Sequence, residues 1–282
     1  MDRKYAIIDI GSNTVRYLGL NGEKRLVTTR LAEGLVATGR LSDDAIARSM
    51  RAVCDYVKLA SMQGLTPRAY ATSAARDAKN TGVLLKAVKE ACGVEPDVLC
   101  GEREAEYALL GADAGDGGLI EIGGGSSQLS FGGFRASFPM GCVRAKDLLA
   151  GAQTLEEMRA RLDGACGGIF RFPRIYLERW AGVGGTITTL GAFALGQKKY
   201  EKAAVTGSIL TPDLVEEMMQ SLYAHGDAAR AEHPLLADRH DVIVPGALIL
   251  SFMMRGMGIA RLRVSDADGM EGYLSYLLAR ES

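Results

Sequence analysis

The 282-residue sequence is poor in histidine and has no excess of charge of either sign. Its three histidines, His225, His233 and His240, do not have the spacing of a metal site, so a zinc enzyme is not expected. The 33 basic residues nearly balance the 34 acidic ones, which leaves a net charge of −1. No overall field therefore attracts DNA or an anionic membrane, and any polyanion has to be held by a local site.

Cysteine is also scarce, and no two cysteines form a C-x-x-C pair. The chain has five: Cys54, Cys92, Cys100, Cys142 and Cys166. An odd number scattered through a chain that is 48% hydrophobic predicts reduced, mostly buried thiols. No apolar segment of a signal peptide follows the N-terminus. Both features favour a cytoplasmic protein.

No uninterrupted apolar run is long enough to cross a bilayer. The most apolar stretch, residues 242–260, is broken by Pro245, Arg255 and three glycines. An arginine is costly at the centre of a membrane, so this stretch predicts a buried core helix and no membrane association.

Strand and helix patterns alternate along the first third of the chain, which predicts an α/β fold. Residues 5–10, 15–20 and 24–29 read as strands, and Asn21-Gly22 is a strong hairpin signal between the last two. Ser42 can cap a helix that ends before Gly64. A strand at 68–71 and a further helix follow, which indicates a mixed sheet.

An internal repeat divides the chain. Residues 119–125 can be laid over residues 7–13: each segment is an apolar strand that carries an acid, Asp9 or Glu121, just before a glycine turn. Both segments continue into a second strand. The repeat predicts two homologous domains that face each other. The glycine-rich segment 115–118 before the second copy is the predicted boundary, which gives domains 1–117 and 118–282.

Two glycine turns facing across a cleft would aim backbone N–H groups at one shared anion, for which a phosphate chain is the natural ligand. Asp9 and Glu121 would then lie beside the phosphates, where their carboxylates would be repelled unless a cation lay between them and the phosphate oxygens. Mg²⁺ is suited to that place. A third glycine turn, residues 182–189, runs into a predicted helix and could also bind phosphate. For either hairpin alone, an ordinary tight turn with a solvated acid is the simpler interpretation.

Several segments in order resemble the exopolyphosphatase / guanosine pentaphosphate phosphohydrolase (Ppx/GppA) family, within the actin, sugar kinase and Hsp70 superfamily. They span nearly the whole chain: residues 9–16 (DIGSNTVR), 71–78 (ATSAARDA), 101–105 (GEREA), 122–127 (IGGGSS), 140–144 (MGCVR), 182–190, 264–266 (VSD) and 271–272 (EG). The resemblance implies two ribonuclease H-like (actin-like ATPase) domains with a cleft between them. It also implies Mg²⁺-assisted release of terminal orthophosphate from polyphosphate or pppGpp, and it is compatible with a homodimer.

The resemblance assigns roles to individual residues. Glu104 matches the family's catalytic glutamate that activates water, although alone it would read as a solvated helix charge. Arg76 matches the arginine that binds substrate phosphate, although alone it would read as a surface partner of Asp77. The remaining candidates for phosphate contacts are Ser12, Asn13, Gly124, Gly125, Ser126, Arg144, Gly184, Gly185 and Thr186, and the candidate metal ligands are Asp9 and Glu121.

Two departures from the family pattern concern the metal. The family segment DIGGGSTE reads here as EIGGGSSQ, so that Glu121 replaces an aspartate and Gln128 replaces a glutamate. Losing one carboxylate predicts weaker or altered Mg²⁺ dependence. A polyphosphate- or nucleotide-binding regulator with little turnover therefore stays open as an alternative, as does a sugar or acetate kinase, although no acceptor site for a kinase can be located.

Overall fold

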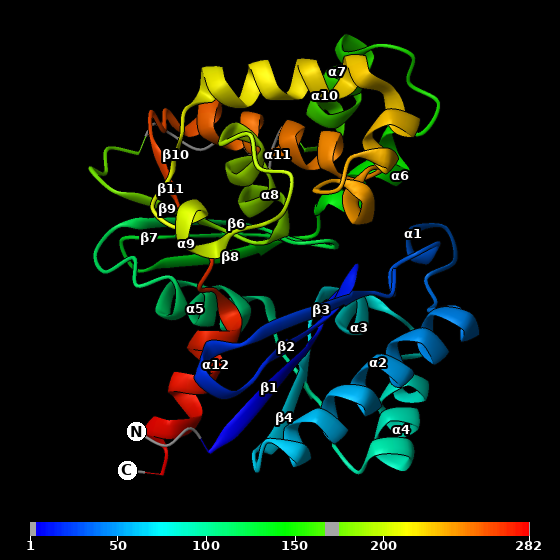
Figure 1. Ribbon diagram of the computed structural model, residues 1–282. Coiled ribbons are helices and arrows are strands. Elements are labelled where there is room, and N and C mark those ends of the chain that lie inside the picture. Colours follow the sequence, from blue (N-terminus) through cyan, green and yellow to red (C-terminus); the bar gives the residue numbers. More distant parts are fainter. Residues whose placement is uncertain (1–3, 167–174, 282) are drawn as a thin grey trace.

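The computed structural model describes residues 4–166 and 175–281, which form two β-sheets covered by helices (Figure 1). The first sheet has the order β3-β2-β1-β4-β5, with β1 (Tyr5–Ile10), β2 (Thr14–Leu18), β3 (Lys24–Thr28), β4 (Thr66–Ala71) and β5 (Asp97–Val98). The second has the order β10-β11-β9-β6-β7-β8, with β6 (Gly118–Ile122), β7 (Ser127–Phe131), β8 (Phe134–Phe138), β9 (Trp180–Val183), β10 (Ile209–Leu210) and β11 (Leu262–Val264). The expected α/β class is confirmed.

The repeat seen in the sequence is a repeat of structure. β1 pairs antiparallel with β2 and parallel with β4, and β6 likewise pairs antiparallel with β7 and parallel with β9. Asp9 and Glu121 occupy matching positions one residue before the end of β1 and β6. β1 and β6 are buried along their whole length, as expected of central strands that read as continuous apolar runs.

Four helices accompany the first sheet: α1 (Leu35–Thr38), α2 (Asp43–Met62), α3 (Ser73–Asp77) and α4 (Thr81–Cys92). Of these, α2 packs against β1, β2 and β4, and α4 packs against α2. The Ser42 side chain accepts a hydrogen bond from the Ala45 amide (3.2 Å) and so caps α2 as predicted. Gly64, with φ +69°, takes the left-handed conformation that follows the end of this helix.

A larger group of helices covers the second sheet. It comprises α6 (Cys142–Leu149), α7 (Leu155–Cys166), α8 (Gly185–Ala194), α9 (Lys202–Val205), α10 (Pro212–Glu232) and α11 (Ile243–Met257). Ile243, Leu248 and Ile249, on different sides of α11, are all fully or almost fully buried. The apolar stretch 242–260 is therefore a core helix. Among the described residues, no helix combines the length and apolar character needed to cross a membrane.

Two helices join the halves. α5 (Gly101–Gly111) packs against β6, β7 and β8 of the second sheet, whereas α12 (Gly269–Ala279) packs against α5 and β1 (Figure 1). The first and last described residues consequently lie close together, since Lys4 pairs with Glu281 at 2.9 Å. The predicted boundary after residue 117 coincides with the passage from one sheet to the other, and the division into domains 1–117 and 118–282 stays a prediction.

The cysteines differ from expectation. Cys54 on α2 and Cys92 at the end of α4 form a disulfide, with 5.1 Å between their Cα atoms. Cys100, Cys142 and Cys166 are free thiols. The prediction that all five are reduced is wrong because α2 and α4 pack side by side, a proximity that a separation of 38 residues does not reveal.

Candidate functional site

A cavity of about 330 Å³ lies between the two sheets, at the ends of β1 and β6. Both glycine turns line it, Gly11 to Thr14 from the first sheet and Gly123 to Ser126 from the second, together with the turn at Gly184 and Gly185. Glu104 and the two acids Asp9 and Glu121 also line it. The cavity thus gathers most of the residues that the sequence singled out.

The two turns touch directly. A Cβ atom on Gly124 would stand 3.0 Å from the Asn13 amide nitrogen, and one on Gly125 would stand 2.4 Å from the Ser12 hydroxyl and 2.7 Å from that of Ser73. A Cβ atom at Gly124 would be closer than ordinary van der Waals contact, and one at Gly125 would have to displace both hydroxyls, so glycine at these positions favours the close approach. The prediction that the turns face each other is confirmed by these distances.

Glu104 lies in the first turn of α5 and is held from two sides. Its Oε2 accepts a hydrogen bond from Arg76 Nη1 (3.0 Å), and its Oε1 accepts a longer one from the Ser126 hydroxyl (3.4 Å). Burial raises the pKa of Glu104 to about 7, although Arg76 acts against this rise. A carboxylate with that pKa can both accept and release a proton near neutral pH.

Asp9 and Glu121 form the acidic floor of the cavity. Burial raises the pKa of Asp9, partly offset by Arg16, and it raises that of Glu121 well above its usual range, with further contributions from Asp268 and Glu104. Asp9 Oδ1 is buried without a hydrogen-bond partner, and Glu121 has no hydrogen bond or ion pair within the described residues. Unpartnered carboxylate oxygens in a cavity are the donors that Mg²⁺ prefers.

These two carboxylates are too few to hold a metal alone. Within residues 4–166 and 175–281, no three His, Cys, Asp or Glu side chains gather closely enough to hold a metal ion. A magnesium ion at Asp9 and Glu121 would therefore need oxygens from phosphate and water to complete its shell, which is the usual arrangement for this ion.

Arg16 is a site residue that the sequence reasoning did not single out, although it stands in one of the family segments. Its Nε donates to Asp9 Oδ2 at 2.9 Å, and its Nη1 donates to Asp268. Asp268 also caps α12, accepting from the Met270 amide at 3.0 Å. The charges of Arg16 and Lys24 lower the pKa of Asp268 to about 2. Arg16 thus ties β2 to the start of α12 at the wall of the cavity.

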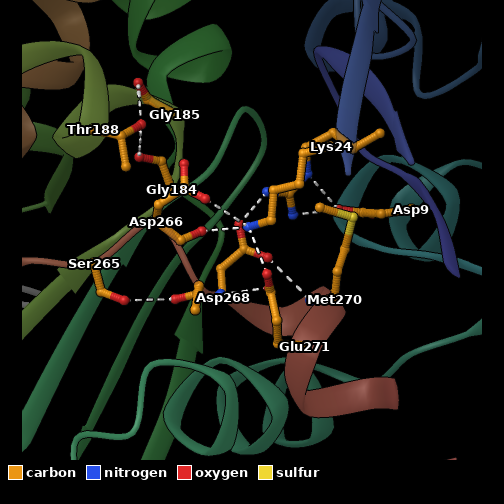
Figure 2. Close-up of polar contacts among 12 residues, drawn as sticks. Asp9, Lys24, Gly184, Gly185, Thr188, Ser265, Asp266, Asp268, Met270 and Glu271 are labelled. Carbon is orange, nitrogen blue, oxygen red and sulfur yellow. Dashed lines mark hydrogen bonds and ion pairs between the residues drawn. The ribbon is translucent and has the colours of Figure 1, made fainter. Parts of the chain in front are cut away.

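A second ion-pair group at the cavity wall was also missed. Lys24 on β3 lies 3.1 Å from Asp266 Oδ2 and 2.9 Å from Glu271 Oε1 (Figure 2). Tyr200 donates its hydroxyl to Asp266 Oδ1 at 2.6 Å, and Lys202 pairs with the same carboxylate at 3.0 Å. No spacing links these positions in the sequence, because they lie up to 247 residues apart and meet only through the fold.

The third glycine turn faces an arginine. Gly184 has φ +90°, and a Cβ atom on Gly185 would stand 2.1 Å from Arg239 Nη2. Arg239 lines the cavity, and among the described residues it has no ion-pair partner. Burial lowers the pKa of its guanidinium from the ordinary value of 12.5. A partly buried cation without an ion-pair partner among the described residues, beside a helix N-terminus, is suited to an anionic ligand, and no motif in the sequence had pointed to it.

Three predicted phosphate contacts do not line the cavity. Arg76 lies behind Glu104 and also donates to the Leu99 carbonyl at 2.9 Å. Arg144 pairs with Asp77. Thr186 is buried and packs against Gly246, where a Cβ atom would stand 2.6 Å from the Thr186 side chain. Their roles as phosphate ligands stay predictions, and Arg76 is placed to act on Glu104.

Comparisons with known proteins agree on one family. The model of the Ppx/GppA phosphatase family matches residues 22–281. Exopolyphosphatase 2 of Mycobacterium tuberculosis is 31% identical over 313 aligned positions, which cover 95% of this chain and 97% of the relative. The crystal structure of the Aquifex aeolicus member of the Ppx/GppA family is 27% identical, with a TM-score of 0.77 and coverage of 99% and 98%. An exopolyphosphatase-like protein of 24% identity shares the fold, with a TM-score of 0.88 and 99% coverage of both chains.

Proposed function

Since the chain belongs to the Ppx/GppA phosphatase family, we propose that it releases terminal orthophosphate from inorganic polyphosphate. The observation that carries the proposal is the direct contact of the two glycine turns beside Glu104. Relatives that align along almost the whole chain are exopolyphosphatases, which supports polyphosphate as the substrate class.

In the proposed reaction, the terminal phosphate lies in the cavity that both glycine turns line, and the backbone N–H groups of the turns that contain Ser12 and Gly124 bind its oxygens. A water molecule attacks the terminal phosphorus, and Glu104 accepts its proton. The anhydride P–O bond to the rest of the chain breaks, and the shortened chain leaves with that oxygen. Arg76 holds Glu104 Oε2 at 3.0 Å and so fixes the carboxylate during the proton transfer.

Mg²⁺ is the proposed cofactor, held by Asp9 and Glu121. Their unpartnered oxygens fit the ion, and when bound it would neutralise charge on the phosphate oxygens. Arg239, which also lines the cavity, supplies a positive charge in addition to that of the metal ion. The guanosine nucleotide pppGpp, which the family resemblance in the sequence also implies, ends in the same phosphoanhydride, so it is the second substrate to compare.

The experiment is orthophosphate release from polyphosphate and from pppGpp, with and without Mg²⁺, by the native protein and by Glu104→Gln. Release that needs Mg²⁺ and is lost in the variant supports the proposal. Binding of polyphosphate without release under any metal would contradict it and favour a regulator that senses the polymer.

A further inference from the structure

Gln128, one of the two positions at which this chain departs from the family pattern, lies outside the cavity lining and is completely buried on β7. It stands opposite Glu121 on β6 and opposite Ser137 on β8. Its Nε2 donates to the Ser126 hydroxyl at 2.9 Å and to the Ser137 hydroxyl at 3.1 Å. The amide therefore engages two serine side chains.

The orientation of this amide follows from the number of groups that it satisfies. As placed, both N–H protons have an acceptor, and only the Oε1 oxygen is buried without a partner. The reverse orientation would turn the carbonyl oxygen toward the two hydroxyls and leave both N–H donors buried without an acceptor, at the place where Oε1 now has no partner. An unpaired carbonyl oxygen is tolerated better than unpaired N–H groups, so the observed orientation is the more stable one.

The direction of this donation decides where the Ser126 proton goes. A serine hydroxyl has a single proton, and its oxygen accepts from Gln128. The proton is thus free for the other neighbour within reach, Glu104 Oε1 at 3.4 Å. Gln128, Ser126 and Glu104 form one chain of donors that ends on the carboxylate.

We infer that Gln128 is a positioning residue, which commits the Ser126 hydroxyl proton to Glu104 and so holds the carboxylate in place for the attacking water. The inference rests on the proposed function of Glu104. It also gives the departure from the family pattern a different meaning: an ionised glutamate at position 128 would itself accept the Ser126 proton and withdraw that donor from Glu104.

A double-mutant cycle on turnover tests the coupling. Gln128→Met keeps the length and the buried volume of the side chain but donates no proton. We expect it to lower kcat about tenfold with KM nearly unchanged, as loss of a charge-assisted hydrogen bond does. In a Ser126→Ala background the same change should have almost no effect. Ser137→Ala removes the other acceptor of Gln128 and should leave kcat at the native level.

Equal loss of kcat from Gln128→Met in both backgrounds would overturn the inference, because Gln128 would then act without Ser126. So would a Gln128→Glu variant that is more active and binds Mg²⁺ more tightly, since position 128 would then be a metal position. Gln128→Glu is expected to lower kcat, like Gln128→Met.

A measurement without substrate separates this inference from the proposed function. The same cycle is followed by chemical unfolding of the apo protein, with the fluorescence of Trp180, the single buried tryptophan, as the probe. We expect the effects of Gln128→Met and Glu104→Gln on the unfolding midpoint to be non-additive when Ser126 is present and additive in Ser126→Ala. Additivity in both backgrounds would refute the hydrogen-bond chain even if the native protein releases phosphate.

Discussion

Glu104→Gln should make the protein more stable at pH 8 while removing its activity. In the folded protein, burial raises the pKa of Glu104 to about 7 from an ordinary value of 4.5. The folded state therefore binds the proton more tightly than the unfolded chain, so stability is lost as pH rises from about 4.5 to about 7. A tenfold change in the acid dissociation constant corresponds to about 1.4 kcal/mol. The ionised Glu104 carboxylate therefore lowers the free energy of unfolding by roughly 3 kcal/mol above pH 7.

Glutamine has the same shape and carries no charge to desolvate. The variant should gain about 3 kcal/mol over the native protein at pH 8 but only about 1 kcal/mol at pH 5, where Glu104 is protonated in the folded state and only the partial ionisation of the unfolded chain contributes. The assay is urea unfolding of the metal-free protein at both pH values. Glu106→Gln, at an exposed position of the same helix, is the control and should show no such difference. An equal effect of Glu104→Gln at pH 5 and pH 8 would refute the reasoning.

Three further predictions concern the turns, the cavity and the disulfide. Gly125→Ala should abolish phosphate release, because its Cβ would stand 2.4 Å from a serine hydroxyl, whereas Gly82→Ala, on a helix with open space around it, should leave release unchanged. Arg239→Ala should raise KM for polyphosphate at least about tenfold with little change in the unfolding midpoint, measured by steady-state kinetics and urea titration. Reduction of Cys54–Cys92 should cost about 4 kcal/mol of stability, and a Cys54→Ala/Cys92→Ala variant should no longer respond to reductant.

Local patterns predicted the fold well. The glycine turns, the cap at Ser42 and the buried helix from Ile243 to Met257 are consequences of short-range preferences and of apolar content, which a sequence displays directly. The repeat of strand, acid and glycine turn also indicated that two turns would meet, and the distances around Gly125 confirm that they do.

Long-range pairings could not be predicted. Lys24 meets Asp266, and Cys54 meets Cys92, only because separate elements pack together, and no spacing marks such partners. Arg76 illustrates the same difficulty. Its 3.0 Å contact with Glu104 joins positions 28 residues apart that no spacing marks as partners, and its predicted role as a phosphate ligand stays a prediction.

The measurement that tests the central claim most directly is turnover of short-chain polyphosphate in ¹⁸O-labelled water with Mg²⁺, followed by mass analysis of the products. Attack of water on the terminal phosphorus, with Glu104 as the base, predicts one ¹⁸O atom in each released orthophosphate and none in the shortened chain, and almost no release by Glu104→Gln. Unlabelled orthophosphate with ¹⁸O in the shortened chain, or undiminished release by Glu104→Gln, would contradict the account.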